Sequence, residues 1–374
     1  MNTSVPHFFN PTDIRWIEWK EVSGLLEVIG TKTLIICGQR FSREKGELMK
    51  RELAQSHSVE IYQGVGPNPT VGSVEEVLKK VKDNTPDCVV ALGGGSVIDT
   101  AKVAALLALN PGSVEEYLLG ERVPHCLGLP VIAVPTTSGT GSEVTPFASI
   151  INEDHMVKSS MAHKYLYPKH AVLDPQLTQS LSPQQTAISG MDALSQAIEG
   201  YWAKASTKVT DALALEGISL ILGNLERVVN EPDDMTARRE MMNGSLLAGL
   251  TISNAKTTAV HSASYPLTAR YGIPHGMACG FLLPGFIRFN EPSLDDHKRN
   301  ALLHRVKVSS MGKLADIVTN LRSRIGMTET LGDMGVRREH IEDILVNGFR
   351  PDRVLNNPRK VTPGALRGLL EELL

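Results

Sequence analysis

The segment 190–200, GMDALSQAIEG, places a carboxylate and an amide where they could share a ligand. Asp192 and Gln196 are four residues apart, and neither proline nor an interior glycine separates Asp192 from Glu199. This composition predicts a helix, in which residues i and i+4 lie on one face. A carboxylate and a histidine at this spacing would indicate a metal site. Gln196 leaves two interpretations open, a metal site with an unusual ligand or a polar helix face.

Two histidines follow later in the chain. His261 and His275 lie on either side of the stretch SASYPLTARYGIP. A single histidine is more often structural than a ligand, so neither residue indicates a site by itself. Together with Asp192 and Gln196 they make metal binding a reasonable hypothesis. The sequence alone does not bring the four residues together in space.

Three turns rich in glycine, proline and hydroxyl side chains follow predicted strands. They are GVGPNPT (64–70), GGGSVIDTAK (93–102) and PTTSGTGSE (135–143). Glycines let a backbone approach a ligand closely, and the amides at a helix start favour an anion such as pyrophosphate. GGGSVIDTAK is not the GxGxxG fingerprint, and a tight glycine turn explains it equally well. Three such loops at the carboxyl ends of parallel strands nevertheless indicate the ligand-binding edge of an open α/β sheet.

The elements that must position these residues change character along the chain. In the first half, short apolar strands alternate with amphipathic helices, which predicts a parallel sheet with helices on both faces. The predicted strands lie in 31–38, 59–65, 87–96 and 129–143, and the predicted helices in 43–55, 73–83 and 99–109. After about residue 183 the pattern becomes helical. We therefore predict an α/β domain over residues 1–183 and an all-helical domain over residues 184–374, where Ser-Pro begins a new helix.

The composition is that of a globular enzyme. The chain has 374 residues, of which 42% are hydrophobic and 21% charged, with a formal net charge of −3. Such a charge gives no electrostatic basis for binding nucleic acid or an anionic membrane. The four cysteines are scattered and include no CxxC pair, which is typical of a reduced, cytoplasmic protein. The sequence shows no signal peptide and no apolar run of about 20 residues, so we expect no membrane partner.

The motifs together resemble the iron-dependent (group III) alcohol dehydrogenase family. GGGSVIDTAK, PTTSGTGSEVTPFA, GMDALxxAIE and the arrangement from His261 to IPHG at His275 occur in the expected order. The resemblance implies a cofactor-binding α/β domain and a helical metal- and substrate-binding domain, an architecture shared with dehydroquinate synthase. It also implies hydride transfer between NAD(P)H and an aldehyde or alcohol, with a divalent metal. We expect Fe²⁺, with Zn²⁺ or Mn²⁺ as alternatives, and a homodimer or larger homo-oligomer.

Carried over residue by residue, the resemblance places the metal ligands at Asp192, Gln196, His261 and His275. The family normally has a histidine at the position of Gln196, and a neutral carbonyl oxygen is a harder and weaker donor than imidazole. We expect weakened binding or altered metal choice, and the alternative is a site without metal. At Tyr265 many relatives carry a histidine with a proton-relay role. A tyrosine hydroxyl could donate a hydrogen bond to the substrate, but its ordinary pKa of about 10 makes it a poorer proton shuttle.

The resemblance also implies a set of cofactor-binding residues. They are Asn68, Gly94, Gly95, Ser96, Asp99, Thr136, Thr137, Thr140 and Lys158. Gly38 belongs with them, because NAD-preferring relatives tend to have an aspartate there that holds the ribose hydroxyls. Without that charge a 2′-phosphate is not repelled, and Arg40 is close enough in sequence to pair with it. We expect NADPH to be accepted as well as NADH; the alternative is that Arg40 is a solvated loop charge.

Two cations suggest the substrate. Lys256 and Arg270 stand where small or apolar residues are common in the family, and cations near a site that reduces aldehydes favour phosphonate or carboxylate groups. The run K-T-T-A-x-H-x-x-S-Y-P resembles the phosphonoacetaldehyde reductase branch, which makes 2-hydroxyethylphosphonate in phosphonate biosynthesis. We expect Arg270 in the loop before IPHG, and Lys256, Arg270 and Tyr265 to act on a small anionic aldehyde. For each cation the alternative is an exposed surface charge.

Three other functions fit the same sequence. A general alcohol dehydrogenase would reduce neutral or hydroxylated aldehydes. A lyase or cyclase like dehydroquinate synthase would hold NAD without consuming it. A catalytically silent nucleotide-binding protein, suggested by Gln196 and Tyr265, would bind the cofactor without turnover.

Overall fold

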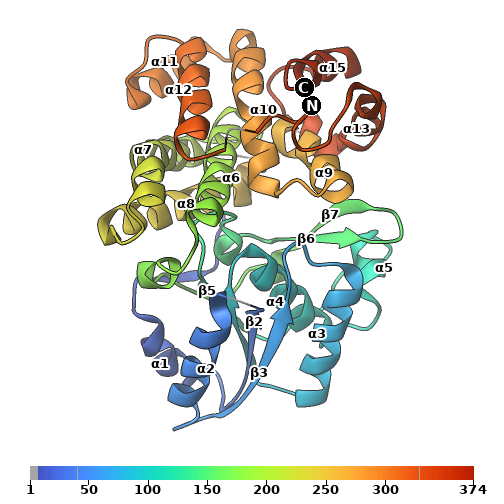
Figure 1. Ribbon diagram of the computed structural model, residues 1–374. Coiled ribbons are helices and arrows are strands. Elements are labelled where there is room, and N and C mark those ends of the chain that lie inside the picture. Colours follow the sequence, from blue (N-terminus) through green and yellow to red (C-terminus); the bar gives the residue numbers. More distant parts are fainter. Residues whose placement is uncertain (1–6, 40, 328) are drawn as a thin grey trace. The chain divides into compact units, whose positions relative to one another are not determined.

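The computed structural model describes residues 7–39, 41–327 and 329–374, and Figure 1 draws the chain as a ribbon. The chain divides into two compact units. The α/β unit contains residues 10–137 and 141–181, and the helical unit contains 138–140, 182–374 and the described residues 7–9. Within the described part of the chain, no helix combines the length and the apolar character that a membrane span requires.

A parallel sheet forms the centre of the α/β unit. Within the described ranges it has six strands in the order β1-β8-β5-β4-β2-β3, and every neighbouring pair is parallel. The strands are β1 (Asp13–Arg15), β2 (Lys32–Gly38), β3 (Ser58–Val65), β4 (Cys88–Gly93), β5 (Val131–Pro135) and β8 (His170–Val172). In register, Ile35 of β2 lies opposite Ile61 of β3 and Val90 of β4.

The central strands are buried on both faces, as their continuous apolar runs predict. In β2, Leu34 and Ile36 belong to one hydrophobic core and Ile35 and Cys37 to another, because successive side chains point to opposite faces of a sheet. Helices α3 and α4 contribute to the first core, and α1 and α2 to the second. The helices of this unit are α1 (Val22–Leu26), α2 (Phe41–Leu53), α3 (Val71–Asn84), α4 (Gly95–Leu107) and α5 (Val114–Leu118).

The α/β unit also contains elements that the sequence did not predict. An antiparallel hairpin of β6 (Phe147–Asn152) and β7 (Val157–Ala162) lies outside the main sheet. The short strands β1 and β8 pair with each other at one side of the sheet. Short 3-10 turns connect elements in both units, namely η1 (Trp19–Glu21), η2 (Ser142–Val144), η3 (Lys164–Leu166), η4 (Pro175–Thr178), η5 (Glu291–Ser293) and η6 (Arg338–His340).

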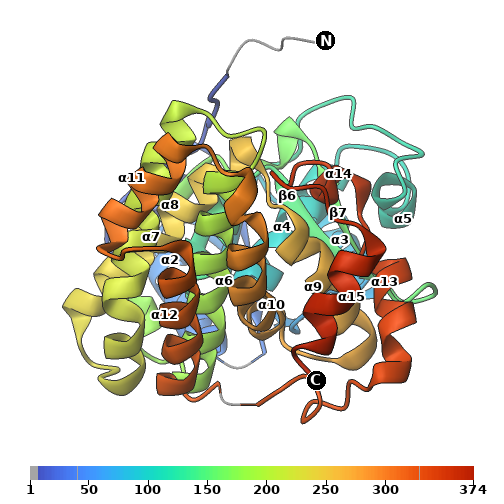
Figure 2. The ribbon, with the colours of Figure 1, turned by 90° about the horizontal axis from the view of Figure 1, so that it is seen from above.

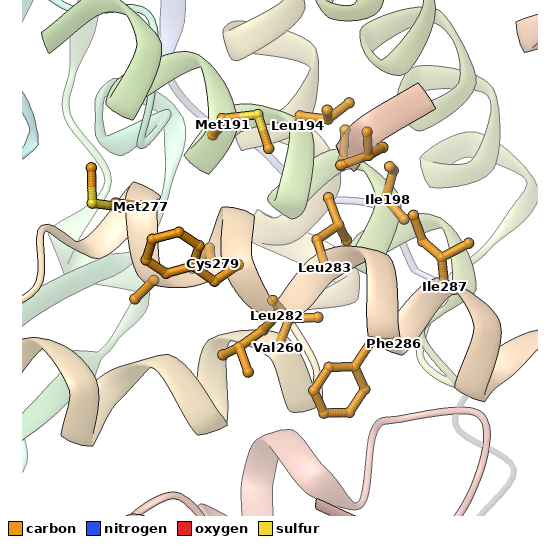
Figure 3. Packing of buried hydrophobic residues seen from close by; sticks show 14 of the residues in the cluster. Met191, Leu194, Ile198, Val260, Met277, Cys279, Leu282, Leu283, Phe286 and Ile287 are labelled. Carbon is orange, nitrogen blue, oxygen red and sulfur yellow. The ribbon is translucent and has the colours of Figure 1, made fainter. Parts of the chain in front are cut away.

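The second unit is built from helices, seen from above in Figure 2. They are α6 (Pro183–Trp202), α7 (Lys208–Asn230), α8 (Met235–Ala255), α9 (Ala259–Tyr271), α10 (His275–Asn290), α11 (Asp296–Val306), α12 (Met311–Arg324), α13 (Ile341–Asn347), α14 (Pro351–Val354) and α15 (Pro363–Glu371). Helices α6 and α10 share one hydrophobic core, in which Leu194 and Ile198 pack with Leu283 and Ile287 (Figure 3). The parallel sheet and the helical unit confirm the predicted fold class.

Helix α6 begins where the Ser-Pro pair predicts it. The hydroxyl oxygen of Ser182 accepts the amide of Gln185 at 3.2 Å, and Pro183 occupies the first helical position. Proline is tolerated there because that position has no intrahelical partner for an amide. This start sets the face on which Asp192 and Gln196 lie.

Candidate active site

Helices α6, α9 and α10 bring three of the predicted metal ligands together in the helical unit. Asp192 is on α6, His261 on α9, and His275 is the first residue of α10. The Oδ1 atom of Asp192 lies 3.4 Å from Nε2 of His261 and 3.9 Å from Nε2 of His275. Donor atoms bound to one ion at about 2.0–2.3 Å lie at most roughly 4.5 Å apart. These separations therefore suit a single ion.

A glycine lets α10 approach α6 at this point. A Cβ atom on Gly276 would lie 2.0 Å from the carbonyl oxygen of Ile188 and 3.1 Å from the Cβ of Asp192. Only a residue without a side chain fits such a contact with backbone atoms. Gly276 therefore allows the preceding residue, His275, to come near Asp192.

Gln196 is buried one turn after Asp192 on α6. Among the described residues, its Oε1 atom and the Nε2 atom of His261 are buried without hydrogen-bond partners. Buried polar atoms are normally paired, so two such atoms in the residues around Asp192 call for a partner. A divalent cation between Asp192, His261 and His275 would satisfy the Nε2 atom of His261, and Gln196 lies one turn after Asp192 on the same face of α6. The residues present thus fit the metal that the resemblance implies.

Glu199 holds the ring of His261. Its buried carboxylate accepts hydrogen bonds from Nδ1 of His261 and from the amides of Thr258 at 2.9 Å and Val260 at 3.0 Å. Burial lowers the pKa of His261, but the carboxylates of Glu199 and Asp192 outweigh it and raise the pKa to about 9. A metal must therefore displace the Nε2 proton, after which the Nδ1 hydrogen bond keeps Nε2 directed to it. Glu199 was not among the predicted residues, although its spacing of seven residues from Asp192 places it on the same helix face.

Cys279 is a further donor that was not among the predicted site residues. It lies one turn after His275 on α10, and its Sγ atom is 4.0 Å from Nε2 of His275. One ligand atom from each of Asp192, His261, His275 and Cys279 lies within 4.8 Å of the other three. Its spacing of four residues from the predicted ligand His275 could have indicated in advance that Cys279 belongs to the site.

Tyr265 lies one turn after His261 on α9, and its ring centroid is 5.8 Å from that of His275. The guanidinium of Arg353, on α14, donates a hydrogen bond to the Tyr265 hydroxyl and is 8% exposed. Burial lowers the pKa of Arg353, but Tyr265, Asp352 and Glu199 outweigh it and raise the pKa. No spacing in the sequence connects Arg353 with the histidines, so sequence reasoning could not find it.

The segment before α14 is attached to α9. The hydroxyl of Ser262 on α9 accepts the amide of Arg350 at 2.8 Å and donates to the carbonyl of Gly348. These bonds position Arg353 beside the helix that carries His261 and Tyr265.

The two predicted substrate cations lie at exposed positions. Lys256 follows the last residue of α8 as its C-cap, with a positive φ of 61°. Arg270 lies in the last turn of α9 and not in the expected loop, because α9 continues to Tyr271 and ends at Gly272, whose left-handed φ is 69°. Its Nη1 atom pairs with Oδ1 of Asp343 at 2.9 Å, so its charge is already partnered within the helical unit.

Most of the predicted cofactor residues meet at the carboxyl edge of the sheet in the α/β unit. The amide of Asn68 donates to the hydroxyl of Ser96 at 3.2 Å, and the amide of Thr136 donates to the carbonyl of Gly93 at 3.0 Å. Gly94 is the N-cap of α4, which begins at Gly95, and a Cβ on Gly94 would lie 3.1 Å from Cγ2 of Thr137. The residues brought together are Asn68, Gly94, Gly95, Ser96, Thr136 and Thr137. The backbone amides at the N-terminus of α4, together with the neighbouring hydroxyl groups, are suited to bind the pyrophosphate of a dinucleotide.

Asp99, on α4, belongs to a buried polar network. Its carboxylate accepts the amide of Ser149 at 2.8 Å and the hydroxyl of Ser142, and it pairs with Nζ of Lys102 at 3.3 Å. Lys102 also donates to the carbonyls of Ser142 at 3.1 Å and Thr145 at 3.2 Å. This network attaches the loop after β5 to α4 and so positions two of the three glycine- and hydroxyl-rich turns, 93–102 and 135–143.

The other predicted cofactor residues lie on separate elements. Gly38 is the last residue of β2, and Lys158 is buried in β7. Thr140 belongs to the segment 138–140 of the helical unit. Arg40 lies outside the described residues.

Comparison with known proteins assigns the chain to a family. Residues 14–175 match the model of iron-containing alcohol dehydrogenase, and residues 186–374 match the C-terminal model of the Fe-containing alcohol dehydrogenase family. The chain belongs to the iron-containing alcohol dehydrogenase family. It is an NAD-dependent alcohol dehydrogenase or aldehyde reductase, of a family that uses NAD(P) and an iron-type metal.

Alignments with individual relatives extend over most of the chain. It is 35% identical to long-chain-alcohol dehydrogenase 1 of Geobacillus thermodenitrificans, over 85% of this chain and 82% of that protein. It is 30% identical to sulfoacetaldehyde reductase of Bilophila wadsworthia, over 83% of each chain. The crystal structure of sulfoacetaldehyde reductase from Bifidobacterium kashiwanohense in complex with NAD⁺ superposes with a TM-score of 0.91, at 33% identity over 99% of both chains.

Proposed function

We propose that the enzyme reduces phosphonoacetaldehyde to 2-hydroxyethylphosphonate, with NADH or NADPH and a divalent metal, in phosphonate biosynthesis. On this proposal the α/β domain, residues 1–183, binds the cofactor, and the helical domain, residues 184–374, binds the metal and the substrate. The observation that carries the choice of an anionic aldehyde is the buried guanidinium of Arg353 beside Tyr265.

The charges around Arg353 support this choice. A buried guanidinium is costly unless it is compensated, and the carboxylate that pairs with it at 3.2 Å, Asp352, is 57% exposed and therefore screened by water. The phosphonate oxygens of a substrate would match the two-pronged donor geometry of this guanidinium.

The roles of the protein residues follow from their contacts. Asp192, Gln196, His261 and His275 would hold the metal. The metal and a reduced nicotinamide, when bound, supply Lewis-acid polarisation of the aldehyde and the hydride that reduces it. The Tyr265 hydroxyl, itself an acceptor from Arg353, would donate a hydrogen bond to the substrate.

Arg353 would hold the non-reacting end of the substrate and orient the aldehyde. Lys256 and Arg270 are proposed as further cations for the same anion. A smaller contribution is expected of Arg270 because Asp343 already pairs with it.

Two other substrate classes are favoured by specific observations. The sulfoacetaldehyde reductases among the relatives favour a sulfonate, which has the same tetrahedral oxyanion geometry. The long-chain-alcohol dehydrogenase favours a neutral substrate. A lyase like dehydroquinate synthase, or a silent protein, predicts no net consumption of cofactor.

The test follows nicotinamide absorbance with phosphonoacetaldehyde, sulfoacetaldehyde and propionaldehyde, offering NADH and NADPH separately to Fe²⁺-loaded enzyme. We expect kcat/KM for phosphonoacetaldehyde to exceed that for propionaldehyde at least tenfold. Charge-assisted hydrogen bonds contribute about 1.5–3 kcal/mol, so Arg353→Met should lower kcat/KM for the anionic aldehydes by roughly 10- to 150-fold. Turnover of propionaldehyde should fall less, because propionaldehyde has no anionic group for the guanidinium to bind and loses only the hydrogen bond that Arg353 gives to Tyr265.

A matched control is Arg238→Met, which removes a buried arginine of α8 that donates to the carbonyl of Pro232, in the segment before that helix. It should affect all three aldehydes alike. If Arg353→Met also lowers turnover of all aldehydes equally, Arg353 is structural. If the unaltered enzyme prefers propionaldehyde, the anionic substrate is refuted and a general alcohol dehydrogenase remains.

A further inference from the structure

We propose that the thiolate of Cys279 is a ligand of the metal site and replaces the strong donor that Gln196 does not supply. The inference rests on the proposed metal-dependent function and adds a ligand to it. It assigns the site four strong donors, Asp192, His261, His275 and Cys279, with the amide of Gln196 beside them.

The geometry places the sulfur within reach of a shared ion. Cys279 and His275 are at i and i+4 of α10, so their side chains lie on one face of the helix. Metal–sulfur and metal–nitrogen bonds of about 2.3 and 2.1 Å let their donor atoms lie up to roughly 4.4 Å apart. The observed separation of Sγ from Nε2 is 4.0 Å.

An alternative explanation is that Cys279 serves only as a packing residue of the hydrophobic core. It is fully buried and belongs to the same hydrophobic cluster as Met277 and Leu282 (Figure 3). A buried cysteine often behaves as a small apolar residue. The two explanations differ in what the sulfur contacts when a metal is present, and that contact can be measured.

The chemistry explains why a glutamine is tolerated at position 196. The Gln196 carbonyl oxygen is neutral and hard, whereas a thiolate is anionic and soft. Binding converts the thiol to a thiolate: the S–H bond breaks, the metal–sulfur bond forms from the sulfur electron pair, and the proton leaves to solvent. A thiolate favours Zn²⁺ over Mn²⁺, whereas a site of oxygen and imidazole donors discriminates less between them.

The first experiment is X-ray absorption at the zinc edge of the Zn²⁺-loaded full-length protein, with Co²⁺ spectra in parallel. We expect a zinc–sulfur distance of about 2.3 Å and a sulfur-to-cobalt charge-transfer band. Cys279→Ala should remove both signals and lower Zn²⁺ affinity, measured by chelator competition, at least about tenfold. The matched control is Cys88→Ala, a buried cysteine of β4 in the α/β unit, which should change neither.

A second variant tests compensation. Adding Gln196→His to Cys279→Ala should restore Zn²⁺ affinity without restoring the sulfur signals. If zinc bound to the unaltered protein shows no sulfur neighbour, the inference is refuted, and this outcome needs no variant to fold. These measurements use no aldehyde. A sulfur-bound metal in an enzyme that prefers neutral aldehydes therefore refutes the substrate proposal alone.

Discussion

Replacing Glu199 with glutamine should weaken metal binding, although Glu199 is not a proposed ligand. One carboxylate oxygen accepts the amides of Thr258 and Val260, and the other accepts Nδ1 of His261. A glutamine has a single acceptor oxygen. If that oxygen stays with the two amides, its NH₂ group faces Nδ1 of His261. Nδ1 must then accept, and the proton moves to Nε2, the atom that the metal needs.

The size of the effect follows from these contacts. Loss of the partner that orients a metal-bound histidine typically costs 10- to 100-fold in affinity, which is about 1.4–2.8 kcal/mol. The assay is chelator competition for Zn²⁺ and Fe²⁺ near pH 7, with a thermal melt to show that the variant is folded. The control is Glu226→Gln, which removes an exposed ion pair with Arg324 and should leave metal affinity unchanged. Folded Glu199→Gln protein that binds metal like the unaltered enzyme would refute the tautomer argument.

Two further predictions concern stability. Gly276→Ala places a Cβ 2.0 Å from the carbonyl oxygen of Ile188 and should lower the free energy of unfolding by about 3 kcal/mol or more. The control Gly223→Ala, where a Cβ would meet no atom within 4 Å, should raise the free energy of unfolding by about 0.5–1 kcal/mol. Paired thermal or urea melts measure both variants, and equal effects would contradict the close contact between α10 and α6. Burial, opposed by Lys102, raises the pKa of Glu143 to about 7 from an ordinary 4.5, so its contribution to stability is fully present below pH 4.5 and is lost as pH rises through 7. Urea melts between pH 4.5 and 8 should therefore show Glu143→Gln gaining up to about 3 kcal/mol relative to the unaltered protein, and parallel pH profiles would show that Glu143 does not titrate in this way.

Part of the fold was readable from local pattern. The apolar runs of β2 and β4 and the helical periods of α3 and α6 are properties of contiguous residues, so the sequence predicts them directly. The short strands β1 and β8 were missed. Each has three residues and is a strand only because it pairs with a neighbour that is distant in the chain.

The candidate site likewise contains residues that local spacing predicts and residues that it does not predict. Asp192 and Gln196 could be paired in advance because a helix fixes which residues share a face. The same rule applied to Asp192 and to His275 would have indicated Glu199 and Cys279. Arg353 follows no such rule, because its position depends on how α14 is attached to α9 through Ser262.

The sequence by itself determined the alternation of the central strands and helices, the two kinds of domain and the motifs that mark the family. The tertiary structure decided which donor atoms approach one another, which histidine nitrogen Glu199 holds, and which arginine is buried beside Tyr265. The reason is physical. Hydrophobic periodicity and helix geometry act over a few residues, whereas a binding site depends on contacts such as that of Gly276 with Ile188, which only the packing of distant helices creates.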